Sequence, residues 1–258
     1  MWRCLGFDTT CTTGACWHVV SGFESTLWFR DVWHGAFVYS TLAFYLSFAD
    51  ANKDFGANRM SNRIVLASQS PRRAELLRQI GLSFDVHVTD VDETKLADES
   101  PEEYVERLAQ EKCQAGWQLS KADSPVAVIG ADTIVLLGDE LLGKPGGLNE
   151  GKAMLTRLAG KTHTVLSGVA VSNGQRLEST VVSSTVTFKA LSRHDIDAYI
   201  ATGEGQDKAG SYGIQGIGGI FVERIEGSFS AVMGLPVQET EALLRTLNID
   251  TWGMRCHG

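Results

Sequence analysis

The residues best suited to chemistry begin with the segment Ser68-Gln69-Ser70-Pro71-Arg72-Arg73, which directly follows the apolar run 64–67. A short apolar run bounded by turn formers predicts a buried strand. Ser70 is a typical helix N-cap residue and Pro71 suits the first helical position, so a helix should follow and end at Gly81. Free N–H groups and two guanidinium groups could then bind a phosphate chain. The alternative is an ordinary strand-to-helix connection with two solvated arginines.

Acidic residues occur in two places where they could meet these cations. Asp132 and Thr133 follow a buried strand predicted over 126–130, and ligands of open α/β sheets collect beyond the carboxyl ends of strands. Asp132 could hold a divalent metal or accept a proton from a water molecule that attacks phosphorus. Asp92 and Glu93 form a second acidic pair, and hard cations such as Mg²⁺ prefer such oxygen ligands. The alternatives are a turn residue at position 132 and a solvated loop face at 92–93.

Two lysines and a glutamine could contribute to the same site. Lys112 shares the apolar stripe of a helix predicted from Ser100 to about Leu119. An unpaired ammonium there is costly, so Lys112 either meets an anion or extends its stem to solvent. Lys144 lies in a Gly-Lys-Pro turn that would hold its ammonium in place, although an exposed turn residue would look the same. Gln215 lies in the glycine-rich loop 207–219 and could donate and accept at a base edge, unless this loop is merely flexible.

The rest of the chain alternates between strand and helix signals, which predicts an α/β fold. Further strands are expected over 84–88, 134–137, 140–142, 164–172, 175–189 and 220–225, and further helices over 149–158, 192–202 and 236–247. The formal net charge of −8 argues against a nucleic-acid-binding face. No stretch reaches the roughly 18 apolar residues of a membrane span. We therefore expect neither nucleic acid nor a membrane as a partner.

Composition changes sharply near Met60. The first 59 residues hold four of the six Trp and three of the five Cys. We predict that residues 1–59 are a disordered or non-native N-terminal extension, followed by one domain over 60–250 and a tail over 251–258. The alternative is a small accessory segment that packs its aromatic side chains on the main domain. The five cysteines show no CxxC or metal-ligand spacing and no secretory signal is evident, which predicts a cytoplasmic location.

Several separated motifs, taken in order, resemble the Maf family of nucleoside triphosphate pyrophosphatases. They are Leu66-Ala67-Ser68-Gln69-Ser70-Pro71-Arg72-Arg73, Asp92-Glu93, Glu111-Lys112, Gly130-Ala131-Asp132-Thr133, Gly143-Lys144-Pro145, Asp207-Lys208-Ala209-Gly210, Tyr212-Gly213-Ile214-Gln215-Gly216 and Gly234-Leu235-Pro236. The resemblance covers about residues 61–247. It implies an α/β fold of the Maf/ITPase-like kind, with an elongated central mixed β-sheet flanked by helices, two lobes with a cleft, and commonly a homodimer.

The resemblance also implies hydrolysis of a nucleoside triphosphate between the α and β phosphates, with a divalent cation such as Mg²⁺ or Mn²⁺. By position, Asp132 resembles the proton-accepting, metal-associated carboxylate and Glu93 a second metal-associated acid. Four residues resemble the phosphate-binding set of the family: Ser68, Arg73, Lys112 and Lys144. Three residues match the substrate-contacting positions that separate subfamilies: Arg72, Thr133 and Gln215.

Arg, Thr and Gln at these three positions resemble the branch of the family that acts on dTTP and UTP. The branch that acts on 7-methyl-GTP tends to have Trp, Gln and Glu instead. A pyrimidine nucleoside triphosphate, canonical or modified, is therefore the expected substrate. The alternatives are a 7-methyl-GTP-type paralogue and a non-catalytic regulator of cell division, since the family has also been linked to septum formation.

Overall fold

The computed structural model describes residues 63–255. The extension predicted over 1–59 and the last three residues of the predicted tail lie outside the described residues. The described part contains no helix with the length and apolar content needed to cross a bilayer.

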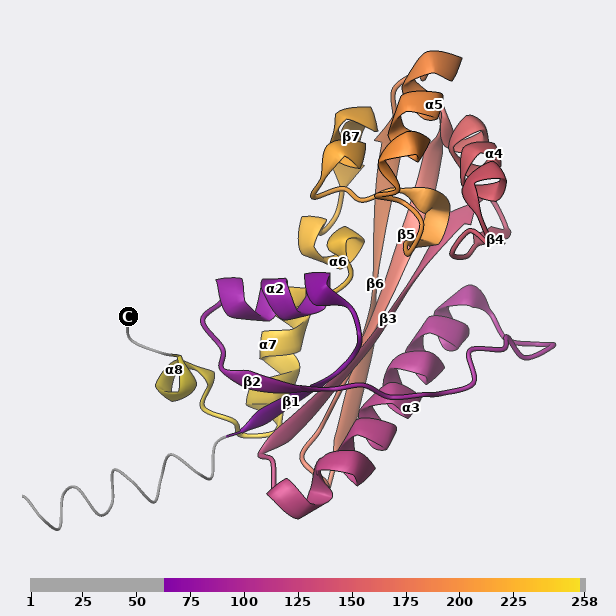
Figure 1. Cartoon of the computed structure of the whole chain (residues 1–258). Helices are drawn as coiled ribbons and strands as arrows, with labels where there is room; N and C mark the ends of the chain where they lie inside the picture. The colour runs from indigo at the N-terminus through magenta and orange to yellow at the C-terminus, as the bar shows by residue number, and fades with distance from the viewer. Residues whose placement is uncertain (1–62, 256–258) are drawn as a thin grey trace, which may run out of the picture. The chain divides into compact units, whose positions relative to one another are not determined.

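Strands and helices alternate through the first half of the described chain (Figure 1). The strands are β1 (Ile64–Ala67), β2 (Phe84–His87), β3 (Ala127–Leu137), β4 (Glu140–Leu142), β5 (Thr162–Ser172), β6 (Leu177–Phe188) and β7 (Val222–Glu226). The α-helices are α2 (Pro71–Gln79), α3 (Pro101–Ser120), α4 (Leu148–Leu158), α5 (Arg193–Thr202), α6 (Phe229–Met233), α7 (Val237–Thr246) and α8 (Thr251–Met254). The 3₁₀-helices are η1 (Lys121–Asp123), η2 (Ala209–Ser211) and η3 (Ile217–Phe221).

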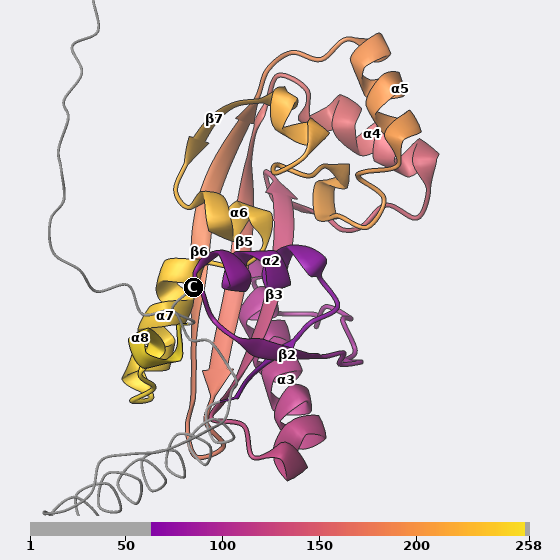
Figure 2. The same ribbon diagram turned by 60° about the vertical axis from the view of Figure 1, so that its left-hand side comes forward.

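The strands form one mixed seven-stranded sheet in the order β2-β1-β3-β5-β6-β7, with β4 paired to β3. β1 pairs in parallel with β2 and β3, whereas the other pairs are antiparallel. The long strands β3, β5 and β6 connect two groups of elements (Figures 1 and 2). One group contains β1, β2, α2 and α3, and the other contains β4, α4 and α5. The predicted mixed sheet flanked by helices is therefore confirmed.

The apolar run of β1 is explained by burial on both faces of the sheet. Ile64 and Leu66 belong to the large core that also contains side chains of α2 and α7. Val65 and Ala67 point the other way and pack with Ala109 of α3. A strand covered on both faces needs apolar residues at every position, because successive side chains alternate between the faces.

The strand predicted over 126–130 is part of a longer one, and this corrects the expected position of Asp132. β3 continues to Leu137, so Asp132 lies within a strand and not at its end. The reason is that β1 ends at Ala67, opposite Gly130, while β5 stays paired with β3 and places Gly168 opposite Asp132. Asp132 thus lies beside the end of β1, although its own strand, β3, continues past it.

Local signals predicted several other boundaries well. The capping boxes at Ser100 and Ser192 are present, and Gly174 adopts a φ of +82° at the turn between β5 and β6. The strand predicted over 220–225 is wrong at its start, because 217–221 form η3. Two short helices, α6 and α8, were not predicted, since helices of four or five residues are too short to show a period.

Helix α3 lies unusually close to the sheet because glycines face it. A Cβ atom added to Gly130 would clash with the carbonyl oxygen of Ala109 and the backbone nitrogen of Cys113. A Cβ atom at Gly168 would lie 2.5 Å from the carbonyl oxygen of Val105. These glycines let the backbone of α3 approach β3 and β5, and this approach brings Lys112, which directly precedes Cys113 on the helix, to the sheet.

Gly130→Ala is expected to lower the free energy of unfolding by about 1–3 kcal/mol, because the added methyl group must push α3 away from the sheet. Urea unfolding measures the change. Gly147→Ala is the matched control, since its φ of 169° is extended and no atom lies within 4 Å of the added Cβ. Equal stabilities of the Gly130→Ala variant and the control would contradict the close-packing argument.

Candidate active site

One cavity of about 770 Å³ opens where β1 ends beside β3. It is bounded by the turn from β1 to α2, the loop after β2, helix α3, the turn after β4 and the loop before η3. All nine residues predicted from the sequence line this cavity: Ser68, Arg72, Arg73, Glu93, Lys112, Asp132, Thr133, Lys144 and Gln215. The fold therefore brings together residues from six separate segments of the chain.

Arg73 joins two of these segments to a further one at Gly234. Its Nε donates to the carbonyl oxygen of Gly234 at 2.8 Å, and its Nη1 donates to Ser68 Oγ at 3.1 Å. Its Nη2 donates to Thr133 Oγ1 at 3.4 Å. The backbone N–H of Ser70, the N-cap residue of α2, also donates to Ser68 Oγ, at 3.1 Å. The guanidinium is therefore held at the N-terminus of α2 in a fixed orientation.

Lys112 lies between two carboxylates. Its Nζ is 2.6 Å from Glu93 Oε1 and 2.6 Å from Asp132 Oδ1. Both Lys112 and Asp132 are buried, so the ammonium on the apolar face of α3 meets anions and does not extend to solvent. This geometry excludes the alternative that Lys112 extends its side chain to place the ammonium in solvent.

Charges in the cavity influence one another. Partial burial favours the neutral form of Glu93, but the hydrogen bond and charge of Lys112, with smaller effects of Lys144 and Arg73, lower the pKa of Glu93 below its ordinary value. Burial lowers the pKa of Arg73, and the negative charge of Asp132 opposes this effect. Glu93 is thus ionised at neutral pH, beside cations that an anionic ligand could share.

Glu93 and Asp132 are the metal ligands predicted from the sequence. In residues 63–255 no group of three or more His, Cys, Asp and Glu side chains is placed to hold a metal ion. Mg²⁺ usually binds one or two carboxylates and takes its remaining ligands from substrate phosphates and water. The two carboxylates therefore fit a cation that arrives with a phosphate chain. Asp92 of the same acidic pair also lines the cavity, and its Oδ1 accepts from the backbone N–H of Thr94.

Arg72 is oriented by a residue that the sequence reasoning did not place in the site. Its Nη1 donates to Asp207 Oδ2 at 2.9 Å, and Asp207 Oδ1 accepts from Lys208 Nζ at 2.6 Å. Burial favours the neutral form of Asp207, but the hydrogen bonds of Lys208 and Arg72 lower the pKa of Asp207 to about 2. The only signal in the sequence is that Asp207 and Lys208 belong to one of the motifs shared with the Maf family.

This pKa predicts a pH dependence of stability. A carboxyl group whose pKa is lower in the folded protein stabilises it fully above the unfolded-state pKa, and loses that effect as the pH falls to the folded-state pKa. The wild type should therefore be more stable than Asp207→Asn above about pH 5, and the difference should shrink toward about pH 2. Urea unfolding of both proteins across this range measures it. A difference that is independent of pH would contradict the prediction.

The comparisons with known proteins agree with the motifs. A family model described as "Maf-like protein" matches residues 63–247, which is well over half of the chain. The chain belongs to the Maf family. Membership confirms the resemblance seen in the sequence, and the matched span coincides with most of the described fold.

Several similar relatives of the chain share the name dTTP/UTP pyrophosphatase. A dTTP/UTP pyrophosphatase from Pseudoalteromonas atlantica is 50% identical over 188 residues, covering 72% of this chain and 97% of the relative. One from Shewanella denitrificans is 52% identical over 188 residues, covering 71% and 95%. One from Escherichia coli is 49% identical over 185 residues, covering 72% and 93%. The match therefore extends over nearly the whole length of these relatives.

Among solved structures, a nucleoside-triphosphatase / dITP/XTP pyrophosphatase from Mycobacterium abscessus is similar with a TM-score of 0.35 and 15% identity, covering 72% of this chain and 94% of that one. A similarity at this level carries no conclusion about function.

The sequence analysis missed two other residues that line this cavity, Tyr104 and Gly234, and the buried Ser167 behind it. Tyr104 donates its hydroxyl to the carbonyl oxygen of Glu93 at 2.7 Å, which fixes the loop after β2 to α3. Gly234 accepts from Arg73, and Ser167 Oγ lies 3.0 Å from Thr133 Oγ1. Each of these residues acts through a contact that the neighbouring sequence does not reveal. Only Gly234 had a signal in the sequence, because it belongs to the last motif shared with the Maf family. Lys144 and Gln215 lie exposed among the lining residues.

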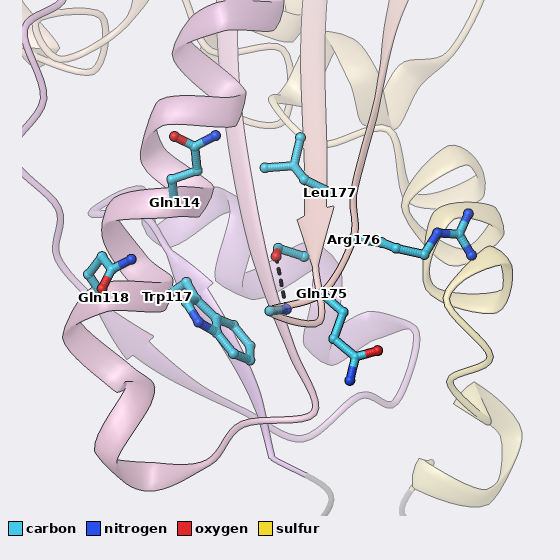
Figure 3. Close-up of a pocket in the computed structure, with 8 residues that line it drawn as sticks. Gln114, Trp117, Gln118, Gln175, Arg176 and Leu177 are labelled. Carbon is cyan, nitrogen blue, oxygen red and sulfur yellow. Dashed lines mark hydrogen bonds between the residues drawn. The ribbon is translucent and has the colours of Figure 1, made fainter.

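A second, smaller cavity of about 210 Å³ lies at the other end of α3, against the turn between β5 and β6 (Figure 3). Its lining residues are Gln114, Trp117, Gln118, Ser172, Gly174, Gln175, Arg176 and Leu177. Arg176 points away from the others, and its guanidinium binds Glu178 Oε1 at 2.5 Å and the carbonyl oxygen of Thr246 at 3.3 Å. Its lining residues include no carboxylate, histidine or lysine that could activate the Ser172 hydroxyl, so this cavity does not compete as an active site.

Proposed function

We propose that this Maf protein hydrolyses nucleoside triphosphates to the monophosphate and pyrophosphate, with dTTP and UTP, or modified pyrimidine nucleotides, as its preferred substrates. The observation that carries the proposal is the single cavity in which Asp132 lies beside Lys112 and within the electrostatic influence of Arg73. The proposal is supported by relatives of about half-identical sequence that are named dTTP/UTP pyrophosphatase.

The charges of the cavity suit a triphosphate. Ser68, Arg73 and the N-terminus of α2 offer donors to the phosphate oxygens, and Lys144 adds an ammonium at the rim. Asp132 accepts the proton of the water molecule that attacks the α-phosphorus, the bond from the α-phosphorus to its bridging oxygen breaks, and pyrophosphate leaves with the electron pair. Fixed positive charges near the leaving group stabilise the transition state more than the ground state.

Glu93 and Asp132 would hold the divalent cation, Mg²⁺ or Mn²⁺, together with phosphate oxygens. Such a cation neutralises charge on the phosphates and lowers the pKa of bound water. Lys112 already neutralises part of the charge of both carboxylates, so its ammonium can turn toward the phosphate chain when the cation arrives. Isothermal titration of Mg²⁺ with and without an unreactive triphosphate analogue tests this proposal. Tight binding of Mg²⁺ alone would contradict a cation site that needs phosphate.

Gln215 would read the base, together with Thr133 and Arg72. Gln215→Glu is expected to raise KM for dTTP and UTP by about tenfold, because a carboxylate cannot donate a hydrogen bond to a base carbonyl. Steady-state kinetics measure the effect. The control is Gln175→Glu, at the exposed turn between β5 and β6, which adds the same charge outside the active-site cavity. It should change KM for dTTP and UTP little. Unchanged KM values for Gln215→Glu would remove this residue from base recognition.

A pyrophosphate-release assay with a panel of nucleotides tests the function. dTTP and UTP should be cleaved with higher kcat/KM than purine nucleotides and 7-methyl-GTP. Preference for 7-methyl-GTP would assign the chain to the other branch of the family. If no nucleotide releases pyrophosphate, the remaining alternative is a non-catalytic regulator of cell division.

We further propose a cytoplasmic homodimer, as the family resemblance implies, and a functional domain over 60–250 with residues 1–59 as an extension. Light scattering after size exclusion tests the dimer, and a monomer at micromolar concentration would contradict it. The intact mass of the protein from its native cells tests whether the extension is non-native, and a mass that includes residues 1–59 would contradict this part of the proposal.

A further inference from the structure

Behind the loop that carries Gln215 lies a carboxylate that does not line the cavity. Glu204 follows α5, and its side chain is turned toward the segment 213–218. Its Oε2 accepts from the backbone N–H of Ile217 at 2.8 Å, and its Oε1 accepts from the N–H of Gly218 at 3.0 Å. One carboxylate thus binds two successive backbone N–H groups on the C-terminal side of Gln215.

A buried tyrosine binds the same loop on the N-terminal side of Gln215. Tyr199, on α5, donates its hydroxyl to Glu204 Oε1 at 3.0 Å and accepts from the backbone N–H of Gly213 at 3.1 Å. Tyr199 is fully enclosed in the core. The loop is therefore fixed at Gly213 and at Ile217, with Gln215 midway between these anchors. In Figure 1 the loop lies between α5 and β7.

The loop follows the carboxylate so closely that side chains would not fit. A Cβ atom at Gly216 would lie 2.5 Å from Glu204 Oε2, and one at Gly218 would lie 3.0 Å from the Tyr199 hydroxyl oxygen. The high glycine content of this segment therefore reflects a backbone that wraps closely around the half-buried Glu204 carboxylate, and not a loop free of constraint.

Glu204 is also connected to Arg72. Its backbone carbonyl accepts from Lys208 Nζ, and Lys208 in turn holds Asp207 at 2.6 Å. Asp207 accepts from Arg72 Nη1 at 2.9 Å. Both Gln215 and Arg72, which differ between the branches of the family, are thus anchored to the same turn after α5.

We propose that Glu204 is a positioning residue for base recognition, which fixes the loop 213–218 so that Gln215 is presented to the nucleobase. This inference rests on the proposed function, because it needs Gln215 to read the base. The ionised form of Glu204 is required, since both of its oxygens accept hydrogen bonds from donors. In agreement with this, burial favours neutral Glu204, but the N–H groups of Gly218 and Ile217 outweigh it and lower its pKa.

The test is Glu204→Gln, which keeps the shape of the side chain but directs an amide N–H₂ group against a backbone N–H. We expect KM for dTTP and UTP to rise about tenfold, with kcat at saturation within about twofold of the wild type. The inhibition constant of inorganic tripolyphosphate, which has no base, should stay within about twofold. A role confined to general stability would not separate the nucleotide from the tripolyphosphate.

Glu226→Gln is the matched control, because Glu226 is exposed on β7 and paired with Arg224 at 2.6 Å. Tyr199→Phe is a second variant, which removes the hydroxyl that binds Glu204 and the N–H of Gly213. If Glu204→Gln fails to fold, Tyr199→Phe should still shift KM in the same direction. Unchanged KM for dTTP and UTP would overturn the proposal, as would an equal rise in KM and in the tripolyphosphate inhibition constant. The wild type is the separate test of the proposed function: if it cleaves no nucleotide, that function fails first and the inference fails with it.

Discussion

Asp132→Asn is expected to lower kcat for pyrophosphate release by about 10²–10⁴, the usual contribution of a general base. Asparagine has nearly the same shape, so the loss would come from the missing proton acceptor and the missing negative charge. The charge matters because Lys112 lies 2.6 Å from Asp132 Oδ1 and would keep only Glu93 as an anionic partner. Single-turnover kinetics at saturating dTTP and Mg²⁺ measure the chemical step directly.

The control for this variant is Asp139→Asn, in the turn between β3 and β4, where the same substitution is exposed and outside the cavity lining. Thermal unfolding of both variants shows whether the fold is retained. A folded Asp132→Asn enzyme with nearly wild-type kcat would exclude Asp132 as the base, and the hydrolysis would need another proton acceptor.

Arg73→Lys is expected to lower kcat/KM for dTTP by about 10²-fold or more, although the positive charge is kept. Arg73 makes contacts with Ser68, Thr133 and Gly234 from three different nitrogen atoms, and a single ammonium cannot replace this fork. Two lost hydrogen bonds of a charged group correspond to roughly 3 kcal/mol, which is about 10²-fold. Steady-state kinetics with dTTP measure the loss.

Arg78→Lys is the matched control, because Arg78 lies on the same helix but is exposed and faces Glu75 at 3.8 Å. Inhibition by pyrophosphate separates phosphate binding from the chemical step, and it should weaken only in the Arg73→Lys variant. Equal kcat/KM values for the two variants would mean that the charge alone, without the geometry of the guanidinium, serves the site.

Much of the fold follows from local signals in the sequence. The apolar run 64–67 reads as a doubly covered strand, and it is one, because every position of β1 is buried. The capping boxes at Ser100 and Ser192 act within one helical turn, so their residues suffice to place the starts of α3 and α5. The family, too, could be identified from motifs alone, since the order of the motifs along the chain needs no structure.

The contacts of the site required the tertiary structure. The sequence placed Lys112 on the apolar face of α3, but it left open whether the ammonium meets an anion. That outcome depends on Gly130, which lets α3 approach β3, and on the pairing that sets Asp132 beyond the end of β1. Neither the close approach of two elements nor the end of a neighbouring strand is encoded by residues next to Lys112.

The same distinction explains the residues that were missed. Asp207, 135 positions from Arg72, and Gly234, 161 positions from Arg73, contribute through long-range contacts. Composition and motif order determined the fold class, the family and the candidate residues of this protein. Only the tertiary structure decided which candidates touch, because hydrogen bonds and ion pairs depend on distances of a few ångströms that the register of the sheet and the packing of α3 set together.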